Sequence, residues 1–229
     1  GYHIKNNGGS SSTRASIYTI PLNDIFEVED GCPLCRMRRL LENRCVEYIM
    51  GAAMMEPDVR IETNRYGFCQ EHFSVMLKQK NRLSLALMIE THLDELIDRC
   101  IPFSQKKGEI SPAKTCFVCR EIESAMKKLL ENAARTAANH AAFASLLSNQ
   151  PYYCFSHYEM FCDVLRGSLP KKNAGRLIAQ LTECERQYFQ SLRKDVHDFT
   201  TTFDYRSTQD LRNESRVKTA VERAVQALK

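Results

Sequence analysis

Eight cysteine and histidine residues in this chain form two copies of one pattern, a CxxC followed at a distance by a CxxH. In chain order they are Cys32, Cys35, Cys69 and His72, then Cys116, Cys119, Cys154 and His157. The inner residues of the two copies have nearly the same separation, 34 positions from Cys35 to Cys69 and 35 positions from Cys119 to Cys154. Thiolate and imidazole at such spacings are the ligand types that zinc prefers in proteins.

The order of the motifs predicts one metal site in each copy. Site 1 is expected to consist of Cys32, Cys35, Cys69 and His72, and site 2 of Cys116, Cys119, Cys154 and His157. Four protein ligands fill a tetrahedral zinc site and leave no open position, which is typical of structural metal sites. A CxxH in the first turn of a helix places both ligands on one face, and the helix dipole favours the thiolate there. We therefore expect two zinc ions.

Three other interpretations of the same residues stay open. Cys32 and Cys35 before a helix also resemble a redox-active dithiol motif, although the βαβ context of thioredoxin-like proteins is missing. Three cysteines and one histidine can also hold iron or an iron–sulfur cluster. Finally, some of the motif cysteines could simply be buried. Outside the motifs, Cys45, Cys100, Cys162 and Cys184 are scattered, and two of them are at helix-like apolar positions where a buried free cysteine is expected.

Composition is that of an ordinary globular protein with reduced cysteines. The chain has 229 residues, 43% of them hydrophobic and 26% charged, and ten cysteines. The formal net charge of +4 would fall to about +2 if each site held Zn²⁺ with three thiolates, which weighs against nucleic-acid binding. No apolar run is long enough to cross a bilayer, and no secretory signal is recognisable. These features predict a cytoplasmic protein without membrane association.

Hydrophobic periodicity predicts an all-α fold, a helical bundle built from two tandem repeats. Apolar residues recur at helical spacing throughout, and no alternating pattern of useful length suggests a strand. We expect a flexible arm over residues 1–16, a first metal-binding repeat over 17–103, a linker over 104–114, a second metal-binding repeat over 115–200, and a C-terminal segment with a helix that docks on the body over 201–229. In that last helix, the docking stripe is expected to be Val217, Val221, Val225 and Leu228.

Other groups of polar residues are weaker candidates for a functional site than the cysteine motifs. Glu90, His92, Asp94 and Glu95 lie close in sequence but do not share one helical face, so a solvated surface is expected. Pairs of lysines such as Lys127 and Lys128 are scattered, without interleaved aromatic residues. No Ser-His-Asp set, phosphate loop or paired-carboxylate motif is present, so no catalytic residue is assigned.

Several segments together resemble an uncharacterised bacterial family of the Clostridia type. The matching segments are residues 17–21 (IYTIP), 31–35 (GCPLC), 67–72 (GFCQEH), 81–83 (NRL), 116–119 (CFVC) and 203–206 (FDYR). The resemblance extends from about Ile17 onward and implies a bacterial cytoplasmic protein. It implies no activity.

The function predicted from the sequence is a zinc-binding binding or scaffold protein with structural metal sites, for which a protein partner or self-association is expected. The first alternative is a thiol-based redox or metal sensor that uses the same cysteines. The second is a nucleic-acid-binding zinc protein.

Overall fold

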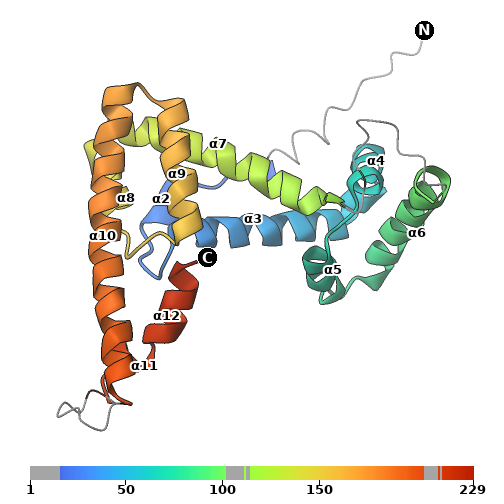
Figure 1. Ribbon diagram of the computed structural model, residues 1–229. Coiled ribbons are helices and arrows are strands. Elements are labelled where there is room, and N and C mark those ends of the chain that lie inside the picture. Colours follow the sequence, from blue (N-terminus) through green and yellow to red (C-terminus); the bar gives the residue numbers. More distant parts are fainter. Residues whose placement is uncertain (1–15, 102–110, 112–113, 204–210, 212) are drawn as a thin grey trace. The chain divides into compact units, whose positions relative to one another are not determined.

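The computed structural model describes residues 16–101, 111, 114–203, 211 and 213–229. Its secondary structure there consists of helices and connecting turns, without strands, which confirms the predicted all-α class (Figure 1). Three predicted segments lie outside the described residues: the arm, apart from Ser16, the linker, apart from Ser111 and Lys114, and the 204–206 part of the FDYR segment.

The chain divides into two compact units that interleave along the sequence. Unit 1 comprises residues 1–20 and 38–126, and unit 2 comprises residues 21–37 and 127–229. These limits do not coincide with the repeats expected over 17–103 and 115–200. Helices α3 (Pro33–Met50) and α7 (Phe117–Asn139) each contribute residues to both units.

Between α3 and α7, the described part of unit 1 contains four elements. They are the 3₁₀ turn η1 (Ala52–Met55), α4 (Pro57–Tyr66), α5 (Gln70–Leu77) and α6 (Arg82–Arg99). Pro57 starts α4 at a position where its missing N–H costs nothing. Asn81 caps α6, because its side-chain oxygen accepts a hydrogen bond from the backbone N–H of Ser84 at 3.2 Å. Helix α4 packs against η1 and α6, and α6 also contacts α5.

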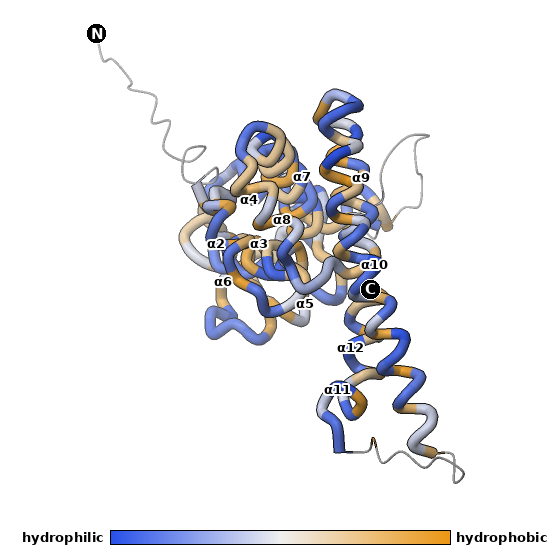
Figure 2. The backbone as a smooth tube through the Cα atoms, turned by 90° about the vertical axis from the view of Figure 1, so that its left-hand side faces the viewer, coloured by the Kyte–Doolittle hydropathy of each residue, from blue (hydrophilic) through white to orange (hydrophobic). Residues whose placement is uncertain are grey.

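Unit 2 is arranged around the long helix α10 (Lys171–Thr201). The other elements are α2 (Leu22–Phe26), α8 (Ala141–Ser148), α9 (Phe155–Ser168), α11 (Ser215–Lys218) and α12 (Ala220–Ala227). Helices α8, α9, α11 and α12 all contact α10 (Figure 1). Hydrophobic and hydrophilic residues alternate along α9 and α10, as expected for helices with one buried face (Figure 2).

The helices that follow the two CxxC motifs each have one apolar face, and its side chains are fully buried. On α3 this face consists of Leu34, Met37, Leu41, Cys45 and Ile49. On α7 it consists of Val118, Ile122, Leu130, Ala133 and Ala137. Spacings of three, four or eight residues keep each set on one side of its helix, so the first turn, which carries the CxxC, is held by the core.

The C-terminal helix does not bury the stripe that the sequence predicts. Of that stripe only Val217, which lies in α11, is buried, while Val221, Val225 and Leu228 are 41%, 63% and 67% exposed. Helix α12 instead buries Ala220 and Ala227. Small side chains let two helices approach closely, which explains the choice of face.

An ion-pair cluster also connects this C-terminal region to α10. The buried Asp195 accepts hydrogen bonds from Arg216 at 2.7 Å and from Arg223 at 2.8 Å, and Arg216 also pairs with Asp198 at 2.6 Å. Burial raises the pKa of Asp195, but the two guanidinium groups outweigh it and hold that pKa below its usual value. The charges therefore reinforce the packing of the alanine face.

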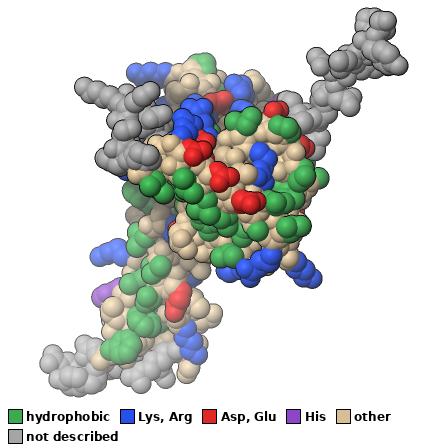
Figure 3. Space-filling model, turned by 90° about the vertical axis from the view of Figure 1, so that its right-hand side faces the viewer, with side chains coloured by type: hydrophobic (Ala, Val, Ile, Leu, Met, Phe, Trp, Pro, Cys, Tyr) green, Lys and Arg blue, Asp and Glu red, His purple; other side chains and the backbone are tan. Residues whose placement is uncertain are grey.

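Unit 1 leaves a group of apolar side chains in solvent. Five of them belong to α4 and α6 or directly follow α6: Ile61, Leu83, Leu93, Ile97 and Ile101. Figure 3 shows one side of the molecule, where hydrophobic and acidic side chains are interspersed on the surface. None of the described helices combines the length and the apolarity that crossing a bilayer requires.

Candidate metal centres

All four cysteine motifs lie at the N-terminal ends of helices. Cys32 and Cys116 directly precede α3 and α7, so the CxxC motifs open these two helices. Cys69 and Cys154 are the N-cap residues of α5 and α9, and the histidine of each CxxH is in the first turn. Unpaired backbone N–H groups and the positive end of the helix dipole surround these positions, and both favour thiolates.

The structure groups the eight residues differently from the sequence prediction. Cys32 and Cys35 lie with Cys154 and His157, a set named here the α3–α9 site; Cys69 and His72 lie with Cys116 and Cys119, the α5–α7 site. In each set the candidate ligand atoms all lie within 4.8 Å of one another. This grouping corrects the predicted sites 1 and 2, because each CxxC meets the CxxH of the other copy. Equal spacing in the two copies is compatible with either pairing, so the motifs alone could not decide it.

In the α3–α9 site the atoms converge on the Nδ1 atom of His157. This nitrogen lies 3.6 Å from the sulfur of Cys32, 3.3 Å from that of Cys35 and 3.1 Å from that of Cys154. The sulfurs of Cys35 and Cys154 are 3.6 Å apart. All four residues belong to unit 2.

The α5–α7 site repeats this arrangement within unit 1. The Nδ1 atom of His72 lies 3.1 Å from the sulfur of Cys69, 3.2 Å from that of Cys116 and 3.4 Å from that of Cys119. The sulfurs of Cys69 and Cys119 are 3.9 Å apart. None of the described cysteines is in a disulfide, whose sulfurs would be about 2.05 Å apart.

These separations match the edges of a zinc tetrahedron. With sulfur at ~2.3 Å and nitrogen at ~2.0–2.1 Å from the ion, tetrahedral angles place two sulfurs about 3.8 Å apart and a sulfur and a nitrogen about 3.6 Å apart. The Cys35–Cys154 and Cys69–Cys119 sulfur–sulfur distances are 3.6 and 3.9 Å, and the sulfur–nitrogen distances run from 3.1 to 3.6 Å. The chemistry and geometry of both sets therefore fit a metal ion.

Backbone amides lower the pKa of the first cysteine of the CxxC in each site. A hydrogen bond from the backbone amide of Cys154 favours the thiolate of Cys32, and one from the amide of Cys69 favours that of Cys116. In both sites the backbone amide of the CxxH cysteine thus lowers the pKa of the first thiol of the CxxC, against stronger effects that raise it. The two centres share this detail as well as their ligand types.

The pKa values of Cys32, Cys116 and Cys119 are nevertheless raised, so these three sulfurs are poor thiolates when no cation balances them. Hydrogen bonds with Cys154 and Cys35, with burial, raise the pKa of Cys32, whereas the bonds from Cys32 and Cys35 lower the pKa of Cys154. Burial and neighbouring sulfurs likewise raise the pKa of Cys119. Burial lowers the pKa of His157, but the adjacent sulfurs outweigh it and raise the pKa to about 9. The sulfurs of the α3–α9 site thus favour a positive charge among them.

A carboxylate outside the ligand sets contacts one of them. Oε1 of Glu42 on α3 lies 2.9 Å from Nε2 of His72, whose ring is buried. Sequence reasoning missed this residue, because a glutamate on a helix ordinarily faces solvent and its position seven residues after Cys35 has no motif significance.

The arginine that follows each CxxC contacts a neighbouring segment of the chain through its guanidinium group. Arg36 donates hydrogen bonds to the carbonyl oxygen of Ile25 and to the carboxylate of Asp30. The guanidinium of Arg120 lies 3.6 Å from the ring centroid of Tyr66, in a cation–π contact. The two arginines occupy matching positions in the sequence and use different contacts.

Gly67 links the segment before Cys69 to the start of α7, and so holds the two motifs of the α5–α7 site together. It adopts φ 57° and ψ −156°, a conformation essentially restricted to glycine. Its carbonyl oxygen accepts a hydrogen bond from the backbone N–H of Phe117 at 2.9 Å. A Cβ atom on Gly67 would lie 2.7 Å from the ring of His92, whose Nδ1 in turn donates to the carbonyl oxygen of Asn64 at 2.8 Å.

We expect Gly67→Ala to lower the free energy of unfolding by about 1–3 kcal/mol from backbone strain alone, with a further loss from the contact with His92. Urea unfolding of the zinc-loaded protein, followed by circular dichroism, measures this. The matched control is Gly175→Ala on α10, where no atom lies near the added Cβ; a stabilisation of about 0.5–1 kcal/mol is expected there. Equal stabilities for the two variants would contradict the role of Gly67.

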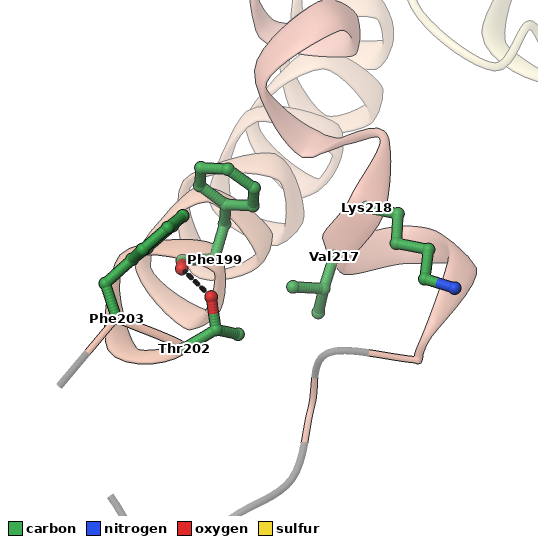
Figure 4. A pocket seen from close by; sticks show the side chains of 5 residues that line it. All are labelled: Phe199, Thr202, Phe203, Val217 and Lys218. Carbon is green, nitrogen blue, oxygen red and sulfur yellow. Dashed lines mark hydrogen bonds between the residues drawn. The ribbon is translucent and has the colours of Figure 1, made fainter. Parts of the chain in front are cut away.

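A pocket lies near the C-terminal end of α10, lined by Phe199, Thr202, Phe203, Val217 and Lys218 (Figure 4). Lys218 is the one charged residue among these five. The hydroxyl of Thr202 donates to the carbonyl oxygen of Phe199 at 2.7 Å. These five residues therefore contain no acid–base pair, and the two cysteine–histidine clusters remain the better candidate sites.

The model of a protein family described as a family of unknown function (DUF6062) matches residues 13–229. No curated protein and no solved structure matches the chain.

Proposed function

The chain belongs to this family of unknown function, DUF6062. From its two sites we propose that it is a zinc-binding protein in which both metal ions are structural. The observation that carries the proposal is the closed Cys₃His set in each unit, with ligand atoms at the edge lengths of a tetrahedron. Four protein ligands leave no position for a substrate or a reactive water, so the metal stabilises the fold and does not catalyse a reaction.

Zinc is the metal that this ligand set fits best. Zn²⁺ accepts three thiolates and one imidazole in tetrahedral geometry and undergoes no redox change. Each ion would join the starts of two helices, α3 with α9 and α5 with α7. Short helices are only marginally stable alone. The free energy of metal binding at these two connections therefore contributes directly to the stability of the fold.

We expect the untagged protein, purified in mild reductant without added metal, to contain two zinc ions per chain by elemental analysis, one for each set. Replacement by Co²⁺ should give the visible absorption of tetrahedral cobalt–thiolate centres. If the protein binds less than one metal ion per chain even after refolding with excess zinc, the proposal is wrong. If iron were found in place of zinc, the two metal sites would be confirmed and the identity of the metal would be corrected.

A second candidate function is a redox sensor, and the sulfur spacing favours it. Cys35 and Cys154, and likewise Cys69 and Cys119, are within 3.9 Å of each other, and three of these four side chains are half-buried. With peroxide as oxidant, two thiols would lose two electrons and two protons to form a disulfide, and the peroxide would be reduced to two waters. Zinc released stoichiometrically at low peroxide would support sensing, whereas retained zinc and unchanged helicity would exclude it.

A further inference from the structure

The two sites differ in the hydrogen bonding behind the histidine. His72 directs Nδ1 toward the sulfurs of the α5–α7 site and Nε2 toward Glu42. The side chain of His72 is 2% exposed and that of Glu42 is 28% exposed, so the contact is largely shielded from water. A histidine that binds a metal through one nitrogen commonly donates its other N–H to a carboxylate, which fixes the ring and increases its basicity.

The α3–α9 site has no such carboxylate among the described residues. The hydrogen bonds described for His157 run from Nδ1 to the sulfurs of Cys32, Cys35 and Cys154. The sequence accounts for the difference, since the residue seven positions after Cys119 is Met126, where Glu42 stands seven after Cys35. A thioether is only a weak hydrogen-bond acceptor.

We propose that Glu42 is a positioning residue for His72 and makes the α5–α7 site the tighter of the two, so that the metal of the α3–α9 site exchanges first. The inference rests on the proposed metal binding. Glu42 keeps the proton of His72 on Nε2, which leaves the Nδ1 lone pair aimed between the three sulfurs. His157 has to be ordered by the metal itself, so binding there carries the cost of fixing the ring.

The test is Glu42→Gln in the full chain, with a zinc chelator as the competing probe. In wild type we expect two separate release steps. The variant should bind its tighter zinc about 10–100-fold more weakly, so that the two steps merge. The matched control is Glu47→Gln, a solvent-exposed glutamate further along the same helix, which should leave both steps unchanged.

The affected site is assigned with cadmium as a spectroscopic probe. ¹¹³Cd NMR of the fully loaded chain should give one resonance per site, and Glu42→Gln should shift one of them. Adding Cys154→Ser or Cys69→Ser leaves the α5–α7 or the α3–α9 site intact, respectively, and only the first of these proteins should lose affinity with Glu42→Gln.

The possible failures are distinguishable. If wild type binds no metal, the proposed function is wrong, and this inference with it. If both metals bind and Glu42→Gln changes neither affinity nor resonance, the sites stand and the role of Glu42 is refuted. Equal weakening of both sites would also refute it, because a general loss of stability does not select one site.

Discussion

A chain with Cys32→Ser and Cys154→Ser should retain one zinc ion at wild-type affinity, and a chain with Cys32→Ser and Cys69→Ser should retain none at that affinity. The first pair removes two ligands from the α3–α9 site and leaves the α5–α7 site whole. The second pair removes one ligand from each site. Loss of an outer hydrogen-bond partner alone costs about 10–100-fold, so loss of a thiolate should weaken each site by more than roughly 100-fold.

The measurement is zinc content after dialysis against a chelator that wild type withstands, with cobalt spectra to show whether a complete tetrahedral site remains. A control with Cys100→Ser and Cys184→Ser removes the same number of cysteines outside the sites and should retain both ions. If the CxxC and CxxH of one copy shared a metal, the two test variants would exchange results. Each outcome therefore identifies one pairing.

The ligands could be predicted from the sequence because their geometry is local. A CxxC before a helix and a CxxH at its first turn fix the relative positions of two ligands each, whatever the rest of the chain does. Which two motifs meet depends on how the chain returns over tens of residues. Neither the 34- nor the 35-residue spacing records that path. The motif order therefore predicts Cys69 as a partner of Cys35, whereas the structure places Cys154 there.

The apolar pattern fails at α12 for a related reason. A stripe of Val221, Val225 and Leu228 has the larger transfer free energy, but the alanine face allows α10 to come close while Arg216 and Arg223 reach Asp195. Periodicity identifies the apolar residues of a helix and not the neighbour available to each face. Glu42 could not be predicted for the same reason, since its role exists only where α3 passes His72.

Cutting the backbone between the two copies should leave the fragments joined by metal. Each site takes two ligands from residues 1–108 and two from residues 109–229. We expect a full chain with a protease site inserted after Gly108 to be cleaved and yet to elute as one species when zinc is bound. Addition of a chelator in reductant should separate or unfold the fragments. At free zinc about 1,000 times its dissociation constant, each site adds about 4 kcal/mol to the association.

The matched control is the same cleaved chain with Cys32→Ser and Cys154→Ser, which keeps one bridging site and should separate at a lower chelator concentration. Uncleaved protein treated with the chelator reports unfolding without separation. The decisive quantity is the metal content of the separated fragments. If each fragment carried one zinc ion after separation, every site would lie within one copy of the motif. Metal-free fragments agree with two bridging ions, since neither part alone holds more than half of the ligands of either site.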